Sequence, residues 1–151
     1  MRIALLSVLL TQLVTSAPKP GHAVVQPTPA DLGAKPGTRV MLFVDVTPKP
    51  NIHVYAPGNE FYIPITIKLN PQADVKAGKL AYPKSEIVTI ADEKVSVFQK
   101  PFRLTQEVEI GKAAKAGSSL VVGGTVNYQA CDDKVCFPPE TAPVSWTIAV
   151  K

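Results

Sequence analysis

The sequence contains two cysteines, Cys131 and Cys136, and this pair of thiols is its clearest candidate for chemistry. They lie within residues 127–141, which read NYQACDDKVCFPPET, and four residues separate them. Three of those four are charged: Asp132, Asp133 and Lys134. Two thiols this close can form a disulfide that exchanges with other thiols, hold a fold together, or bind a metal.

A β-hairpin would bring the two cysteines together. Strand-like residues 125–130 precede the loop at 132–135, and residues 142–150 alternate as the returning strand. Opposed residues of antiparallel strands have Cα atoms ~4.5–5.5 Å apart, and a disulfide needs ~4.4–6.8 Å. Closing so short a loop stabilises a fold by only ~2 kcal/mol in the chain-entropy model. A redox-active pair at an accessible tip and a structural disulfide therefore both stay open.

The charges around the cysteines act in opposite directions on the thiolate that exchange requires. Lys134 favours the thiolate, whereas Asp132 and Asp133 oppose it. The pair is not a CxxC motif, so we expect a weaker nucleophile than a thioredoxin-type site. A metal site is not expected. His22 is expected to be removed with the leader, so the two cysteines and His53 leave at most three soft ligands. The CxxxxC spacing also differs from that of zinc knuckles. We expect no cofactor.

The elements that hold the pair are predicted to be strands. The chain has 15 prolines among 151 residues and no sustained helical period, which favours an all-β fold. We expect a β-sandwich of about 7–9 antiparallel strands. Gly123-Gly124 predicts a bulge or a close backbone approach, and Trp146 a core residue. The predicted strands are residues 39–46, 52–55, 61–69, 79–82, 86–90, 94–98, 102–110, 120–128 and 144–150.

The N-terminal residues predict an exported protein. Residues 1–23 have one basic residue, a short apolar run and then small residues, as a secretory signal peptide does, and we expect the mature chain to start near Val24. Residues 24–38 read as a loose leader with at most one short edge strand, and residues 39–151 as the domain. Loss of Arg2 and Lys19, with no acid removed, lowers the net charge from +4 to +2. So small a charge gives no reason to expect nucleic acid or a membrane surface as partner.

The residues that flank the cysteines resemble one known family. Tyr128-Gln129-Ala130-Cys131, a short acidic loop, Cys136, Phe137 and then Pro-Pro-Glu-Thr are similar to the N-terminal periplasmic domain of the DsbD thiol:disulfide interchange family. Weaker similarity at residues 51–69 and 82–98 extends this resemblance over roughly residues 30–150. It implies an immunoglobulin-like, periplasmic thiol-disulfide oxidoreductase. Its partners would be a thioredoxin-like domain, a membrane thiol reductant conductor and periplasmic disulfide proteins.

The resemblance also implies roles for single residues. Cys136 would form the mixed disulfide with partners, and Cys131 would resolve it. Candidates near the site are Tyr55, Tyr128, Gln129, Asp132 and Phe137. For Tyr55, packing beside the sulfurs and an ordinary half-buried position both remain open, while His53 is expected to be an ordinary surface or core histidine.

The sequence departs from the family in two ways. The family covers its disulfide with an aromatic cap loop, but the matching residues 92–94 hold no aromatic residue, so shielding would be weaker or would come from Phe98, Phe102 or Tyr55. The family's full-length proteins continue into membrane spans, whereas this sequence stops at Lys151, so we expect either a free domain with separate partners or a diverged member of the family. The alternative function is a non-catalytic immunoglobulin-like binding module whose disulfide only stiffens the tip.

Overall fold

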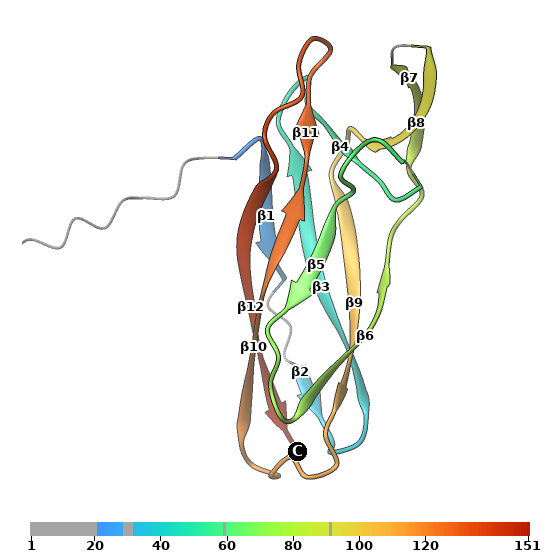
Figure 1. Ribbon diagram of the computed structural model, residues 1–151. Helices are drawn as coiled ribbons and strands as arrows, with labels where there is room; N and C mark the ends of the chain where they lie inside the picture. Colours follow the sequence, from blue (N-terminus) through green and yellow to red (C-terminus); the bar gives the residue numbers. More distant parts are fainter. Residues whose placement is uncertain (1–20, 29–31, 59, 91) are drawn as a thin grey trace, which may run out of the picture.

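The computed structural model describes residues 21–28, 32–58, 60–90 and 92–151, and these form an all-β protein (Figure 1). Within this part of the chain there are twelve strands and no helix, so none that could cross a membrane. The predicted all-β, immunoglobulin-like class is confirmed. The strand number exceeds the expected 7–9 because three short strands, β1, β2 and β11, add to the nine that alternation predicts.

Two four-stranded sheets form the main sandwich. The first has the order β1-β3-β9-β6 and the second β2-β12-β10-β5. All neighbours pair antiparallel except β2 and β12, which pair parallel. The strands of the first sheet are β1 (Ala23–Pro27), β3 (Arg39–Pro48), β9 (Phe102–Ile110) and β6 (Val75–Ala81); those of the second are β2 (Leu32–Ala34), β12 (Glu140–Val150), β10 (Ser119–Tyr128) and β5 (Thr66–Leu69).

Alternating side chains fill the space between these two sheets. Val44 and Val46 of β3 and Val122 and Val126 of β10 are fully buried, while their neighbours along the strands are more exposed. Trp146 of β12 joins the same core at 3% exposure, which confirms its predicted position. Its indole Nε1–H donates a 3.1 Å hydrogen bond to the carbonyl of Phe43 across the sandwich.

A third sheet lies at one end of the sandwich, opposite the C-terminus (Figure 1). Its order is β11-β4-β8-β7, with β11 (Ala130–Cys131), β4 (His53–Tyr55), β8 (Glu93–Phe98) and β7 (Glu86–Ile90). It has a small hydrophobic cluster of its own, separate from the main core. We call this third sheet and residues 132–137 the tip. The tip cluster consists of buried Tyr55, Val95, Val97 and Cys131, with Tyr62, Val88 and Ile90 packed against it.

The N-terminal segment is more ordered than the expected loose leader of residues 24–38. Residues 23–27 form β1 along β3, and residues 32–34 form β2 along β12. The correction has a physical cause: both are edge strands that take their backbone hydrogen bonds from a neighbour, so proline-rich composition is tolerated there. Most of the expected signal peptide lies in residues 1–20, outside the described residues.

The strand expected at residues 61–69 begins only at Thr66. Pro64 has no N–H to give to a ladder, and Tyr62 turns back to stack on Tyr55. The predicted close approach at Gly123-Gly124 is confirmed, because a Cβ at Gly124 would lie 2.6 Å from the carbonyl oxygen of Lys68. No bulge occurs there, since the β10–β12 register runs through both glycines. The register shift lies instead between Ala77 and Leu80 in β6.

Candidate redox site

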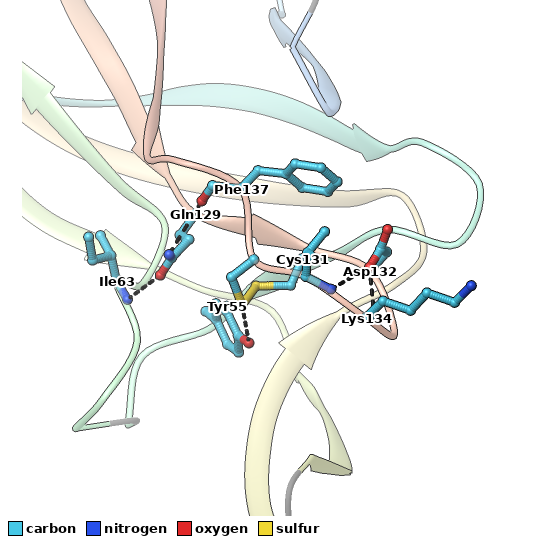
Figure 2. The surroundings of a disulfide bond; sticks show 9 residues. Tyr55, Ile63, Gln129, Cys131, Asp132, Lys134 and Phe137 are labelled. Carbon is cyan, nitrogen blue, oxygen red and sulfur yellow. Dashed lines mark hydrogen bonds between the residues drawn. A yellow bond between two sulfur atoms is a disulfide. The ribbon is translucent and has the colours of Figure 1, made fainter.

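Cys131 and Cys136 are joined by a disulfide at the tip, as the hairpin argument predicts (Figure 2). The sulfur atoms are 2.06 Å apart and the Cα atoms 4.0 Å apart. The hairpin is smaller than expected, because the cysteines lie outside the β10–β12 ladder. After Tyr128 the chain leaves that ladder, and Cys131 pairs with His53 of β4 in the third sheet.

Asp132 closes the loop between the cysteines. Its Oδ1 accepts hydrogen bonds from the backbone N–H groups of Lys134, at 2.7 Å, and Val135, at 2.8 Å (Figure 2). These two bonds, with a smaller contribution from the Lys134 charge, lower the pKa of Asp132. The Asp132 N–H donates to the carbonyl of Val135 at 3.0 Å. The Asp132 carboxylate, which the sequence predicts to oppose the thiolate, therefore also stabilises the turn between the cysteines.

The two cysteine residues differ in exposure. Cys131 is 1% exposed and belongs to the tip cluster, whereas Cys136 is exposed. An incoming thiolate must reach a disulfide sulfur directly, so access selects which one is attacked. Cys136 is therefore the more exposed of the two cysteines, and Cys131 is buried behind it.

Two stacked tyrosines lie against the disulfide. Tyr55 is fully buried, and its hydroxyl is 3.5 Å from Cys136 Sγ. Burial, with the neighbouring Tyr62, raises the pKa of Tyr55 to about 12, so the hydroxyl keeps its proton at neutral pH. The Tyr62 ring stacks on the Tyr55 ring with centroids 4.1 Å apart. The structure thus places Tyr55 beside the sulfurs rather than at an ordinary half-buried position.

The second aromatic residue at the tip cluster is Tyr62, which the sequence does not single out. Phe98 and Phe102, two of the expected sources of shielding, stack on each other at 4.1 Å and pack in the main core. Tyr62 follows the turn at Pro57-Gly58, in residues that the sequence assigns to a strand. Because apolar alternation fits both a strand and a loop folded onto another side chain, it carries no signal for this stacking.

Gln129 braces the segment that carries the pair. Its Oε1 accepts from the Ile63 N–H at 3.3 Å, and its Nε2 donates to the Phe137 carbonyl at 3.4 Å (Figure 2). The side chain therefore links the loop that holds Tyr62 to the residue after Cys136.

An N-terminal clasp holds the other side of the same segment. We use this name for His22, Tyr128, Phe137 and Glu140. The His22 ring stacks on Phe137 with centroids 3.7 Å apart, and its Nδ1 contacts Glu140 Oε1. Glu140 Oε2 accepts from the Tyr128 hydroxyl at 2.6 Å and from the His22 N–H at 2.9 Å. His22, which the sequence analysis places in the removed leader, is thus in contact with the residue next to Cys136.

His53 lies directly opposite Cys131 in the β4–β11 pairing. It is 5% exposed, and among the described residues its Nε2 has no hydrogen-bond partner. Its ring meets Tyr55 edge-on at 5.4 Å. Burial lowers the pKa of His53, and the charges of Asp133 and Asp132 offset part of that shift. His53 lines a polar pocket of about 280 Å³ together with Asn51, Ile52, Gln99 and Asp133.

Across residues 21–28, 32–58, 60–90 and 92–151, no group of three or more His, Cys, Asp or Glu side chains is arranged to hold a metal ion. The site is therefore built from the disulfide, the tyrosines, the acidic turn and a buried histidine.

The sequence matches one family model over residues 22–147, described as "Thiol:disulfide interchange protein DsbD, N-terminal". No curated protein matches it. The reduced DsbD N-terminal domain of Neisseria meningitidis is 19% identical, with a TM-score of 0.54 over 82% of this chain and 83% of that chain. A complex between the DsbD and PilB N-terminal domains of Neisseria meningitidis gives 17% identity and a TM-score of 0.55 over 82% and 80%.

The N-terminal periplasmic domain of ScsB from Proteus mirabilis has a TM-score of 0.58 at 14% identity, over 89% of this chain and 49% of that chain. At these identities the structural similarities show the fold. The family match covers most of the sequence, including both cysteines and the residues of the clasp.

Proposed function

This chain belongs to the family of DsbD N-terminal domains, and from that premise we propose that it passes electrons through the Cys131–Cys136 couple. The electrons would come from a membrane thiol reductant conductor by way of a thioredoxin-like domain. They would go to periplasmic proteins that contain disulfides. The reaction is thiol–disulfide exchange, in which each disulfide reduced is matched by one formed.

The observation that carries the proposal is the unequal exposure of the two cysteine residues. Exposed Cys136 would form the mixed disulfide, and Cys131, 1% exposed, would resolve it. A disulfide that served only to stabilise the fold would not require one accessible sulfur beside a tyrosine hydroxyl, which lies 3.5 Å from Cys136 Sγ. The unequal exposure favours an exchange site over the alternative of a binding module with an inert disulfide.

The proposed partners and location follow the family. The Neisseria meningitidis DsbD N-terminal domain has been seen in complex with a PilB N-terminal domain, and the related ScsB domain is described as periplasmic. For this chain we infer export through its N-terminal signal sequence. An oxidising compartment outside the cytosol is also where a disulfide persists.

A trapping experiment tests the roles of the two cysteines. Cys131→Ser should accumulate a mixed disulfide with a thioredoxin-like partner, because no resolving thiol remains. Cys136→Ser should accumulate none, because its remaining thiol is buried. Trapping only with Cys136→Ser would show that the roles are reversed.

The reduction potential separates exchange from a structural disulfide. We expect the Cys131–Cys136 couple to equilibrate with a thioredoxin-like dithiol, at a potential above about −300 mV. A potential well below that value would favour the binding-module alternative. The binding-module alternative would also be favoured if the double variant Cys131→Ser, Cys136→Ser were less stable than the unmodified chain but had the same exchange activity.

A further inference from the structure

We propose that His53 accepts the proton of the Cys131 thiol when Cys131 resolves the mixed disulfide. This inference rests on the proposed function, because it concerns the second step of the same exchange. It assigns a chemical role to a residue that the sequence predicts to be an ordinary surface or core histidine.

The resolving step creates a need for such a group. In the mixed disulfide, Cys136 Sγ is bonded to the partner's sulfur and Cys131 carries a proton. That proton must leave before the Cys131 electron pair can attack Cys136 Sγ, since the thiolate is the nucleophile. Burial in apolar surroundings opposes the thiolate, and Cys131 lies in the tip cluster at 1% exposure. Bulk water therefore has little access to remove the proton.

The fold places His53 within reach of that sulfur. Cys131 and His53 are directly paired across the antiparallel β11–β4 ladder, so their side chains emerge on the same face with Cβ atoms ~4.5–5.5 Å apart. The neighbouring pair, Ala130 and Val54, points into the main core instead. Tyr55, two residues from His53, is on the same face as Cys131 and contacts Cys136.

His53 also has a nitrogen to offer. Neutral imidazole carries one N–H donor and one acceptor nitrogen, and buried side-chain nitrogens normally have partners. The Nε2 of His53 is buried and lacks a partner among the described residues. Burial holds the pKa of His53 below its ordinary value, so the ring is neutral at pH 7 and can take up a proton. Asp132 and Asp133 of the loop then favour the imidazolium once it forms, and Tyr55 remains protonated.

Resolution forms one disulfide bond and breaks another. The Cys131 S–H bond breaks and its proton moves to His53 Nε2. The Cys131 sulfur forms a bond to Cys136 Sγ, and the bond from Cys136 Sγ to the partner breaks. The partner's sulfur leaves with the electron pair as a thiolate, and the proton on His53 passes to that thiolate or to solvent. Two electrons have moved from this chain to the partner's disulfide.

The test follows the two steps separately with a chromogenic aromatic disulfide as probe. The reduced chain should release one coloured thiolate when Cys136 attacks, and a second when Cys131 resolves. We expect His53→Gln to leave the first phase unchanged and to slow the second about a hundredfold at pH 7, within the range for general acid–base catalysis. Gln99→Ala is the matched control. Gln99 lines the same pocket as His53, but its side-chain amide cannot accept a proton.

The pH profile distinguishes proton transfer from a packing defect. In the unmodified chain the second phase should be nearly independent of pH around neutrality, and should slow in acid as His53 becomes protonated. In His53→Gln it should rise about tenfold per pH unit, because only thiolate formed by solvent can then react. If His53→Gln does not fold, the pH profile of the unmodified chain still tests the proposal. A tenfold rise per pH unit in the rate of its second phase would overturn the proposal.

Two other results would overturn it. An unchanged second phase in His53→Gln would exclude this histidine while leaving the proposed function intact. A second phase that is slow in Asp133→Asn and normal in His53→Gln would assign the proton to the carboxylate. Absence of the first phase in the unmodified chain would instead refute the proposed function, and this inference with it.

Discussion

The Tyr55 hydroxyl is a polar group that lies next to the sulfur of Cys136. It lies 3.5 Å from Cys136 Sγ, and its pKa of about 12 keeps the proton on oxygen over the physiological range. After reduction it can donate a hydrogen bond to the Cys136 thiolate. A donor to a charged acceptor favours the charged form and so lowers the pKa of the thiol.

We therefore expect Tyr55→Phe to raise the pKa of the Cys136 thiol. Loss of about 1 kcal/mol of thiolate stabilisation corresponds to about a fivefold smaller thiolate fraction at pH 7. The rate of alkylation of Cys136 against pH, in a Cys131→Ser background, measures this shift.

Tyr82→Phe is the matched control for Tyr55→Phe. The Tyr82 hydroxyl donates at 3.0 Å to the carbonyl of Ile65, so its loss should affect stability and not the Cys136 titration. An unchanged titration in Tyr55→Phe would show that its hydroxyl does not act on the sulfur.

At the residue level the sequence supplies the chemistry but only part of its surroundings. The motif around Cys131 and Cys136 identifies the pair and its flanks, because those residues are adjacent in the chain. Tyr62 is missed because its partner Tyr55 is reached through a loop, and periodicity does not encode loop packing. The importance of His53 depends on a register between β4 and β11, two strands far apart in sequence.

Among the elements, β12 begins at Glu140, and this residue ties the strand to the N-terminal segment. Burial alone would raise the pKa of Glu140, but the hydrogen bonds from Tyr128 and His22 outweigh it and lower the value. The unfolded chain therefore binds this proton more readily than the folded one. The carboxylate stabilises the fold above the unfolded-state pKa of ~4.3, and that contribution is lost as the pH falls through the folded value.

Glu140→Gln should consequently destabilise the chain by about 1–3 kcal/mol at pH 7, since it weakens hydrogen bonds to a charged acceptor. The difference from the unmodified chain should shrink below about pH 4, where Glu140 itself becomes protonated. Urea unfolding across this pH range measures both effects. Glu107→Gln serves for comparison, because Glu107 forms a 3.5 Å surface ion pair with Arg39; an equal loss in both variants would contradict a special role for the clasp.

Strand prediction succeeds where one face is buried along the whole element. Residues 39–46, 102–110 and 120–128 alternate clearly, and β3, β9 and β10 contain them. It fails for β1 and β2, which are short, proline- and glycine-rich in their surroundings, and held by pairing with longer neighbours. It also fails for β11, a two-residue strand that is too short to show alternation and that pairs with β4.

At the scale of the whole molecule, the main core and the tip cluster are separate bodies of packed side chains. Stability and redox behaviour should therefore respond to different substitutions. Trp146→Phe removes the 3.1 Å hydrogen bond to the Phe43 carbonyl, which still accepts from the Thr28 N–H at 3.0 Å, and the loss of one such hydrogen bond costs about 0.5–1.5 kcal/mol.

We expect Trp146→Phe to lower the free energy of unfolding by about that amount without moving the reduction potential of the cysteines. Because Trp146 is the sole tryptophan, its replacement removes the tryptophan fluorescence signal, and unfolding should be followed by circular dichroism instead. A shifted potential would show that the main core and the tip are energetically coupled.

The clasp also bears on where a signal peptide would be cleaved from this chain. His22 stacks on Phe137 and Ala23 is 8% exposed in the core, so cleavage after Ala23 would remove the first contact and leave the second at a new terminus. We predict that the mature chain begins upstream of Gly21. Intact mass measurement of the exported protein checks this, and a mature start at Val24 would contradict it.

β12 runs from Glu140, beside the redox loop, to Val150 at the opposite end of the molecule (Figure 1). Its 11 residues extend about 35 Å at the usual rise of a strand. If an anchor followed Lys151, it would attach the domain at the end where β12 finishes, and Cys136 would lie at the opposite end. With such an anchor, a partner attached to the same surface would have to extend about the same distance from it to reach Cys136.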